Sequence, residues 1–327
     1  MNLLLVRLTS EMAEQVYNAP GVGTTFSQIV AVAQRPPDRS VALWWEQDHP
    51  DELQPEQTRV YYHQLIKDHG ITHAIICQPL LWYSEVVAEV CRMHGVKVFW
   101  TEAFLGGLCP LDAVGCHYTQ DNEIVRYEAC TPLAIPELYF VTKHPQPTAR
   151  HPAELLAALE VTNPYDCVMV FGQVPGDMSL KQTGGLTYEA WLDALLETNP
   201  DTIFLFKHHP FAETELVKER PRFRVINEDV HTLLNAFPVC AAYSSTVIFE
   251  GLIRGCRFVT GGYHTMRGLT HHVSDLASAG PIRRLAFTPP YEQLRRRLSF
   301  LTRWYFQRLD SLRTLQRLLQ PAAECYR

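Results

Sequence analysis

Long apolar runs are absent from this 327-residue chain, and no segment approaches the roughly 18 consecutive apolar residues that span a bilayer. The apolar stretch at residues 3–6 is followed at once by Arg7, so we expect no signal peptide. A basic excess is also missing, because 29 Lys and Arg residues stand against 35 Asp and Glu residues. The net charge of −6 argues against nucleic acid as a partner. We therefore expect a cytoplasmic protein, either soluble or peripheral to a membrane.

The usual cysteine and aspartate motifs of metal sites are missing as well. The nine cysteines form no C-x-x-C pair, and several lie inside apolar stretches such as residues 74–77 and 239–241. This pattern is typical of reduced thiols that pack as small apolar side chains. Cys109 and Cys116 have no zinc-site spacing, and the chain contains no D-x-D motif. We expect neither a bound metal nor a cofactor.

Apolar runs alternate with helical patterns along the first half of the chain. Hydrophobic residues make up 46% of the sequence and charged residues 20%, which is typical of a globular protein with substantial cores. Buried strands are expected at residues 3–6, 41–45, 73–77 and 96–100, with helices at 57–68 and 84–94. Each helical pattern ends near a glycine, Gly70 or Gly95. This alternation predicts a parallel sheet covered by helices.

Prolines gather between residues 131 and 152, which makes this stretch the best candidate for an interdomain connection. The alternation then restarts, with strands expected at residues 167–172, 202–207, 224–227, 239–243 and 257–260 and helices at 188–197, 230–237 and 247–254. Two successive α/β units of this kind describe the GT-B architecture, in which ligands bind at the carboxyl ends of the strands. We predict an α/β fold with two Rossmann-like domains, residues 1–150 and 151–327, and an active site in the interdomain cleft.

The chain ends in a basic amphipathic stretch, residues 291–319, in which leucines recur at three- and four-residue spacings and arginines outnumber acids. We expect one helix that belongs to the C-terminal domain. Two interpretations stay open. The helix packs on its domain with a solvated basic face, or it contacts the anionic inner membrane or a partner in an assembly complex.

Two histidines precede a proline at the end of one expected strand, in Lys207-His208-His209-Pro210. Proline keeps His209 out of helical geometry, so its imidazole can be held at the carboxyl end of the strand and donate to a phosphate oxygen. Lys207 would add positive charge there. A His-Pro pair alone is weak evidence for a binding site.

Three hydroxyl residues, Ser244, Ser245 and Thr246, open a helical pattern directly after another strand. A helix start presents N–H groups and partial positive charge, which together favour anions. Plain N-capping would need one hydroxyl only, so three of them opposite a His-Pro element favour phosphate binding. Glu250 follows on an otherwise apolar helix, where it either bonds a ribose hydroxyl or is an ordinary exposed carboxylate.

Carboxylates follow expected strands in both halves of the chain. Asp177 lies just after a Pro-Gly turn that follows Gln173, and Glu102 comes after the strand at residues 96–100. Double displacement at the anomeric carbon of a sugar needs one carboxylate nucleophile and one acid/base. Asp177 is also consistent with an Asx turn or a helix cap.

Several segments resemble the bacterial β-Kdo transferases of capsule and O-antigen synthesis. In the second half they are residues 173–177, 207–210, 244–252, 259–263 and 268–270, and in the first half 102–104 and 111–115. Membership in this family would imply a GT-B fold, CMP-β-Kdo as the donor, no metal ion, and retention of anomeric configuration. By motif, Asp177 would form a glycosyl–enzyme adduct, Glu102 would be the acid/base, and His209 would hold the CMP phosphate with the hydroxyls of residues 244–246.

Two further residues follow a Gly-Gly turn. His264 and Arg267 could meet the Kdo carboxylate or the phosphate, or they could belong to the loop surface. The expected activity is transfer of β-Kdo to a glycan or glycolipid acceptor. Bacterial sialyltransferases, which use another CMP-activated keto-acid sugar, share the His-Pro and hydroxyl segments. Two alternatives therefore stay open: an inverting transferase with a carboxylate base, and a non-catalytic sugar- or nucleotide-binding subunit of a polysaccharide complex.

Overall fold

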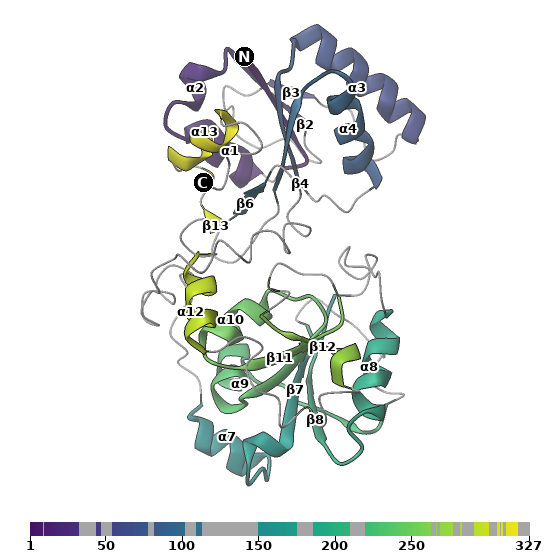
Figure 1. Ribbon diagram of the computed structural model, residues 1–327, viewed down its shortest axis with the longest axis vertical. Helices are drawn as coiled ribbons and strands as arrows, with labels where there is room; N and C mark the ends of the chain where they lie inside the picture. The colour runs from purple at the N-terminus through teal and green to yellow at the C-terminus, as the bar shows by residue number, and fades with distance from the viewer. Residues whose placement is uncertain are drawn as a thin grey trace. The chain divides into compact units, whose positions relative to one another are not determined.

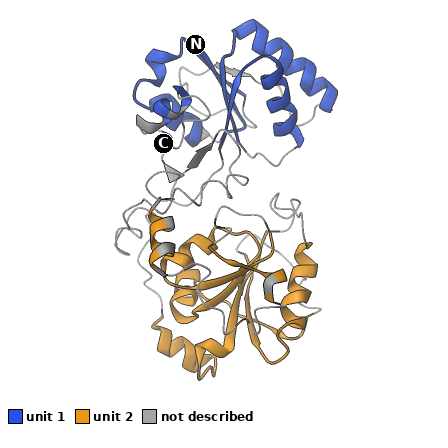
Figure 2. Cartoon of the chain, viewed as in Figure 1, with its two compact units in different colours: residues 1–119, 301–327 blue, residues 120–300 orange. Residues whose placement is uncertain are grey.

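The chain forms two compact units, residues 1–119 with 301–327 and residues 120–300, which are called unit 1 and unit 2 (Figure 2). The structure is a computed structural model. It describes residues 1–8, 10–32, 44–46, 54–77, 82–101, 109–112, 150–174, 186–209, 220–262, 266, 269–276, 282, 291–300, 306–307, 309 and 312–319.

Unit 1 contains a seven-stranded sheet in the order β13-β6-β5-β4-β1-β2-β3. The strands are β1 (Asn2–Val6), β2 (Gln28–Val32), β3 (Trp44–Glu46), β4 (His73–Cys77), β5 (Lys97–Thr101), β6 (Cys109–Asp112) and β13 (Phe306–Gln307). Strands β1 to β5 are parallel and follow the doubly wound order 3-2-1-4-5. Strand β6 pairs antiparallel with both β5 and β13.

Helices cover both faces of this sheet (Figure 1). They are α1 (Ser10–Asn18), α2 (Val22–Thr25), α3 (Pro55–His69), α4 (Trp82–Met93) and α13 (Leu312–Leu319). Alternate residues of β1 point to opposite layers, so Leu3 packs with α1, α2 and α13, whereas Leu4 packs with α3 and α4. Burial on both faces explains why β1 is an unbroken apolar run.

Unit 2 contains a six-stranded parallel sheet in the order β12-β11-β10-β7-β8-β9. The strands are β7 (Cys167–Phe171), β8 (Ile203–Lys207), β9 (Phe223–Val225), β10 (Val239–Ala242), β11 (Arg257–Thr260) and β12 (His271–His272). The helices are α7 (Pro152–Ala158), α8 (Tyr188–Glu197), α9 (Val230–Ala236), α10 (Val247–Ile253) and α12 (Tyr291–Phe300), with 3₁₀ turns at Pro164–Asp166 and Val273–Asp275. This is the Rossmann order 3-2-1-4-5-6, with β7 and β10 adjacent at its centre.

The predicted fold class is confirmed, because both units carry a doubly wound sheet of largely parallel strands with helices on its faces. Gly70 and Gly95 have positive φ angles of 55° and 70°, as glycines that end helices do. Strand β2 and helix α1 were not predicted. The buried, unbridged cysteines Cys77, Cys91, Cys167, Cys240 and Cys256 match the expected packing of reduced thiols. An active site between the domains stays a prediction.

The C-terminal stretch differs from its prediction. It forms two helices, of which α12 belongs to unit 2 and α13 to unit 1, where Leu318 is fully buried. The chain therefore returns to its first unit, and the predicted division at residue 150 does not match the compact units. A β-carbon on Gly21 would lie 2.6 Å from Leu315, so this glycine lets α13 approach α2 closely.

One of the two interpretations of this basic stretch gains support, because the apolar side of α13 packs on unit 1. Contact of its basic residues with a membrane or a partner stays a prediction. Within the part of the chain that the structure describes, every helix is too short or too polar to cross a bilayer.

Candidate functional site

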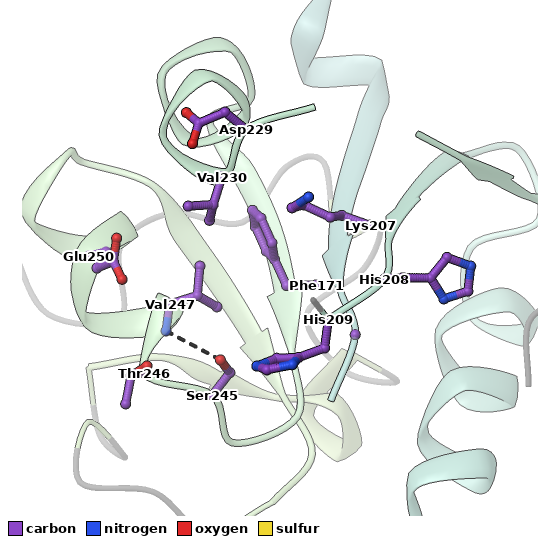
Figure 3. Close-up of a pocket in the computed structure, with 11 residues that line it drawn as sticks. Phe171, Lys207, His208, His209, Asp229, Val230, Ser245, Thr246, Val247 and Glu250 are labelled. Carbon is purple, nitrogen blue, oxygen red and sulfur yellow. Dashed lines mark hydrogen bonds between the residues drawn. The ribbon is translucent and has the colours of Figure 1, made fainter. Parts of the chain in front are cut away.

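A pocket of about 300 Å³ opens at the carboxyl edge of the unit 2 sheet (Figure 3). It is lined by Phe171, Gly172, Lys207, His208, His209, Asp229, Val230, Ser245, Thr246, Val247 and Glu250. These residues come from the ends of β7 and β8 and from the starts of α9 and α10. The size is at the lower end of the range for small-molecule sites.

The strand order explains why a pocket forms here. Strands β7 and β10 are neighbours, and the chain leaves them toward opposite sides of the sheet, which opens a crevice at their carboxyl ends. Gly172 also lines the pocket, where the ends of β7 and β8 lie close together. A β-carbon there would lie 3.0 Å from the Phe206 ring and 3.1 Å from the Lys207 carbonyl, so glycine lets the ends of β7 and β8 come this close without a shift of these neighbours.

One wall of the pocket carries a lysine, a histidine and hydroxyl groups. Lys207 and His209 are half-buried, and Figure 3 shows the His209 ring turned toward Ser245, whereas the His208 ring points away from the other labelled side chains. The Ser245 Oγ accepts a hydrogen bond of 3.3 Å from the Val247 N–H. Ser245, rather than Thr246, therefore caps α10, and the Thr246 hydroxyl makes no capping bond. This wall suits an anion such as a phosphate.

Two carboxylates also line the pocket. The Asp229 carboxylate caps α9, accepting 2.9 Å from the Thr232 N–H. Glu250 is 6% exposed, so of the two alternatives left open for it, the ordinary exposed carboxylate is wrong, and the bond to a ribose hydroxyl stays a prediction. Burial raises the pKa of Glu250 from 4.5 to about 7, an effect that Arg254 opposes and Asp229 reinforces. A carboxyl group with this pKa can donate as well as accept a hydrogen bond near neutral pH.

Two residues that sequence reasoning missed, His231 and Arg254, lie next to Glu250. Arg254 donates 3.0 Å to the Glu250 carbonyl through Nη1 and 2.9 Å to His231 Nδ1 through Nη2. His231 Nδ1 lies 3.5 Å from Glu250 Oε2. Asp229 was detectable as an N-cap before the predicted helix. The pairing of His231 with Arg254 depends on packing between α9 and α10 and leaves no local signal.

The structure brings together five of the sequence-predicted donor-site residues: Lys207, His209, Ser245, Thr246 and Glu250. Gln173 is buried, and its N–H donates 3.2 Å to the Tyr188 hydroxyl. Neither Gln173 nor Ser244 lines the pocket.

The remaining predicted site residues, Glu102, Asp177, His264 and Arg267, lie outside the described residues. Among the residues that are described, no three His, Cys, Asp or Glu side chains gather as a metal site would require. The expected absence of a metal stays a prediction.

The two Rossmann-like units define a fold of the GT-B class. No protein-family model and no curated protein sequence matches the chain. Among solved structures it is similar to the KpsC β-Kdo 2,7 transferase of Thermosulfurimonas dismutans, with 16% identity, a TM-score of 0.51, and coverage of 90% of this chain and 89% of that one.

Two other solved structures match at lower similarity. The β-Kdo 2,4 transferase structure of KpsC from the same organism has 16% identity, a TM-score of 0.43, and coverage of 89% and 88%. A glycosyltransferase from Rickettsia africae has 9% identity, a TM-score of 0.42, and coverage of 92% and 93%. At these identities the likeness concerns the fold.

Proposed function

We propose that this chain is a retaining glycosyltransferase that transfers β-Kdo from CMP-β-Kdo to a bacterial glycan or glycolipid acceptor. One observation carries the proposal. The unit 2 pocket joins Lys207 and His209, from the end of β8, to the hydroxyls of Ser245 and Thr246 at the start of α10. This is the edge where a doubly wound sheet binds the phosphate of a nucleotide.

The lining of the pocket fits the phosphate and the ribose of CMP. The phosphate would lie between Lys207, His209 and the hydroxyl groups, and the ribose hydroxyls would bond Glu250. With a pKa of about 7, Glu250 is partly protonated near neutral pH, and its protonated form can donate one hydrogen bond and accept another, which matches a pair of ribose hydroxyls. With cations and N–H donors on the phosphate, we propose that the donor binds without a metal ion.

The chemistry would follow two displacements. The Asp177 carboxylate attacks the anomeric carbon of Kdo, and the bond to the phosphate oxygen breaks as CMP leaves with the electron pair. Glu102 then takes the proton of an acceptor hydroxyl, whose oxygen attacks the same carbon while the Asp177 carboxylate leaves. Two inversions retain the configuration.

Intact-protein mass spectrometry after incubation with freshly generated CMP-Kdo tests the proposal. We expect an adduct of one Kdo on the wild type and none on Asp177→Ala. Asp201→Ala is the control, because Asp201 is an exposed residue between α8 and β8 and should leave the adduct in place.

Other results would overturn parts of the assignment. Donor consumption without an adduct would favour an inverting transferase or simple hydrolysis. Reaction with CMP-sialic acid but not with CMP-Kdo would replace the donor sugar. Binding of CMP without turnover of either donor would favour a non-catalytic subunit.

A further inference from the structure

The carboxyl edge of the unit 1 sheet carries a cation that the proposed donor chemistry does not use. Arg7 directly follows β1, which lies between β2 and β4 at the centre of the doubly wound order. Ligands of such sheets bind outside the carboxyl ends of the strands where the chain winds in opposite directions. Arg7 therefore occupies in unit 1 the position that the end of β7 occupies beside the pocket of unit 2.

The backbone of Arg7 has a left-handed conformation, with a φ of 59°. This conformation is unfavourable for residues other than glycine, asparagine or aspartate. A hydrogen bond of 2.8 Å from the Arg7 N–H to the Val32 carbonyl at the end of β2 holds it. A side chain kept in an unfavourable backbone conformation at such an edge is typical of a functional position.

A buried aromatic pair supports the guanidinium. Its carbon lies 5.6 Å from the centre of the Tyr83 ring, and the Tyr83 hydroxyl shares a hydrogen bond of 2.6 Å with the Tyr62 hydroxyl. Burial lowers the pKa of the Arg7 guanidinium, and it raises the pKa of the Tyr83 hydroxyl, so the tyrosine stays neutral. A partly desolvated guanidinium attracts an anion more strongly than one in open water.

An exposed indole contacts the same tyrosine. Trp82, the first residue of α4, is 45% exposed, and its ring packs edge-on against Tyr83 with centroids 5.8 Å apart. An indole offers a broad apolar face on which the C–H face of a sugar ring can pack. Because both groups contact Tyr83, Arg7 and Trp82 lie within the length of a disaccharide of each other.

We propose that Arg7 and Trp82 form a binding site for an anionic sugar, with Arg7 on its carboxylate or phosphate and Trp82 on its ring face. The Tyr62–Tyr83 pair positions both groups. In the proposed transferase, an acidic glycan bound at this site would be the acceptor. This acceptor role rests on the proposed function.

Fluorine NMR of the full chain labelled with 5-fluorotryptophan tests the site directly. The chain has six tryptophans, so Trp82→Phe assigns the Trp82 resonance. Kdo and glucuronate serve as carboxylate sugars, glucose 6-phosphate as the phosphate sugar, and glucose as the neutral control. Each titration is run with and without CMP.

We expect the Trp82 resonance to shift saturably with at least one acidic sugar and not with glucose. Arg7→Asn, in which asparagine tolerates the left-handed backbone, should weaken this binding by about ten-fold or more. Arg92→Asn makes the same change at the far, exposed end of α4 and should stay within about two-fold. The other five fluorine resonances report whether each variant is folded.

A response to carboxylate sugars alone, or to the phosphate sugar alone, supports the site and identifies its anion. An equal response to glucose, an unchanged affinity in Arg7→Asn, or no movement of the Trp82 resonance overturns it. Binding of CMP, measured by calorimetry, reports separately on the donor site. A chain that fails to bind CMP but responds at Trp82 would lose the proposed function and keep this site.

Discussion

Nη2 of Arg254 donates a hydrogen bond of 2.9 Å to Nδ1 of His231. Arginine can only donate, so Nδ1 accepts and the ring proton of His231 lies on Nε2. Burial lowers the pKa of His231, and the positive charge of Arg254 lowers it further. His231 is therefore neutral, and its 3.5 Å approach to Glu250 is not an ion pair. Without a cation from His231, burial dominates the titration of Glu250.

The first prediction concerns the pH dependence of stability at Glu250. Its pKa is raised from 4.5 to about 7 in the folded protein, so between these values the folded state binds more protons than the unfolded state. Stability from this group therefore falls as pH rises through this range. Glu250→Gln should remove the loss, which is on the order of 3 kcal/mol at most.

Urea denaturation at pH 5 and pH 8 measures this effect. The advantage of Glu250→Gln over the wild type should be larger at pH 8. The pKa of the buried His231 is lowered, so its contribution to stability rises with pH. Comparing the two proteins at each pH cancels this contribution. Glu189→Gln, a change at an exposed position of α8, should show little pH dependence. An advantage that is equal at both pH values would mean that Glu250 is ionised throughout.

The second prediction separates two adjacent histidines. His209 faces Ser245 in the pocket, whereas the His208 ring points away and packs edge-on against Phe206 at 5.2 Å. His209→Ala should weaken CMP binding by about ten-fold to a hundred-fold, because it removes a charge-assisted bond to phosphate. His208→Ala should have a much smaller effect. Calorimetric titration with CMP distinguishes them, and equal losses would contradict the phosphate role of His209.

Much of the fold was predictable because buried parallel strands have short, continuous apolar sequences. The predicted bounds at residues 73–77 and 257–260 match β4 and β11. Strand β2, residues 28–32, was missed although it is apolar, and so was α1, the amphipathic helix between β1 and β2. The return of the last residues to unit 1 was not predictable, since α12 and α13 share one leucine spacing across the break between them.

The residues of the candidate site were predictable where they directly follow a strand. His209 and Ser245 stand at such ends, and the strand order brings them to one pocket. The burial of Glu250 was not predictable, because it depends on how α9 packs beside α10. Arg7 was missed because its backbone conformation and its contact with Tyr83 leave no trace in local sequence.

The third prediction concerns Gly172. A β-carbon at this position would lie 3.0 Å from the Phe206 ring and 3.1 Å from the Lys207 carbonyl, so Gly172→Ala requires these neighbours to shift by about a few tenths of an ångström beside the pocket. We expect a loss of about 1–3 kcal/mol in unfolding free energy together with weaker CMP binding. Gly23→Ala is the control, because its β-carbon would meet open space. Unchanged CMP affinity in Gly172→Ala would show that the pocket tolerates this shift.

The last prediction tests whether the end of the chain belongs to unit 1. Leu318 of α13 is fully buried in the cluster that contains Leu3 and Val16, whereas its neighbour Leu319 is 42% exposed. Leu318→Ala should lower the free energy of unfolding by about 2–5 kcal/mol, since it leaves a cavity. Leu319→Ala should cost less than about 1 kcal/mol. Hydrogen exchange should localise the effect of Leu318→Ala to α1, α2 and β1. If exchange accelerated in unit 2 instead, α13 would not be packed as the structure places it.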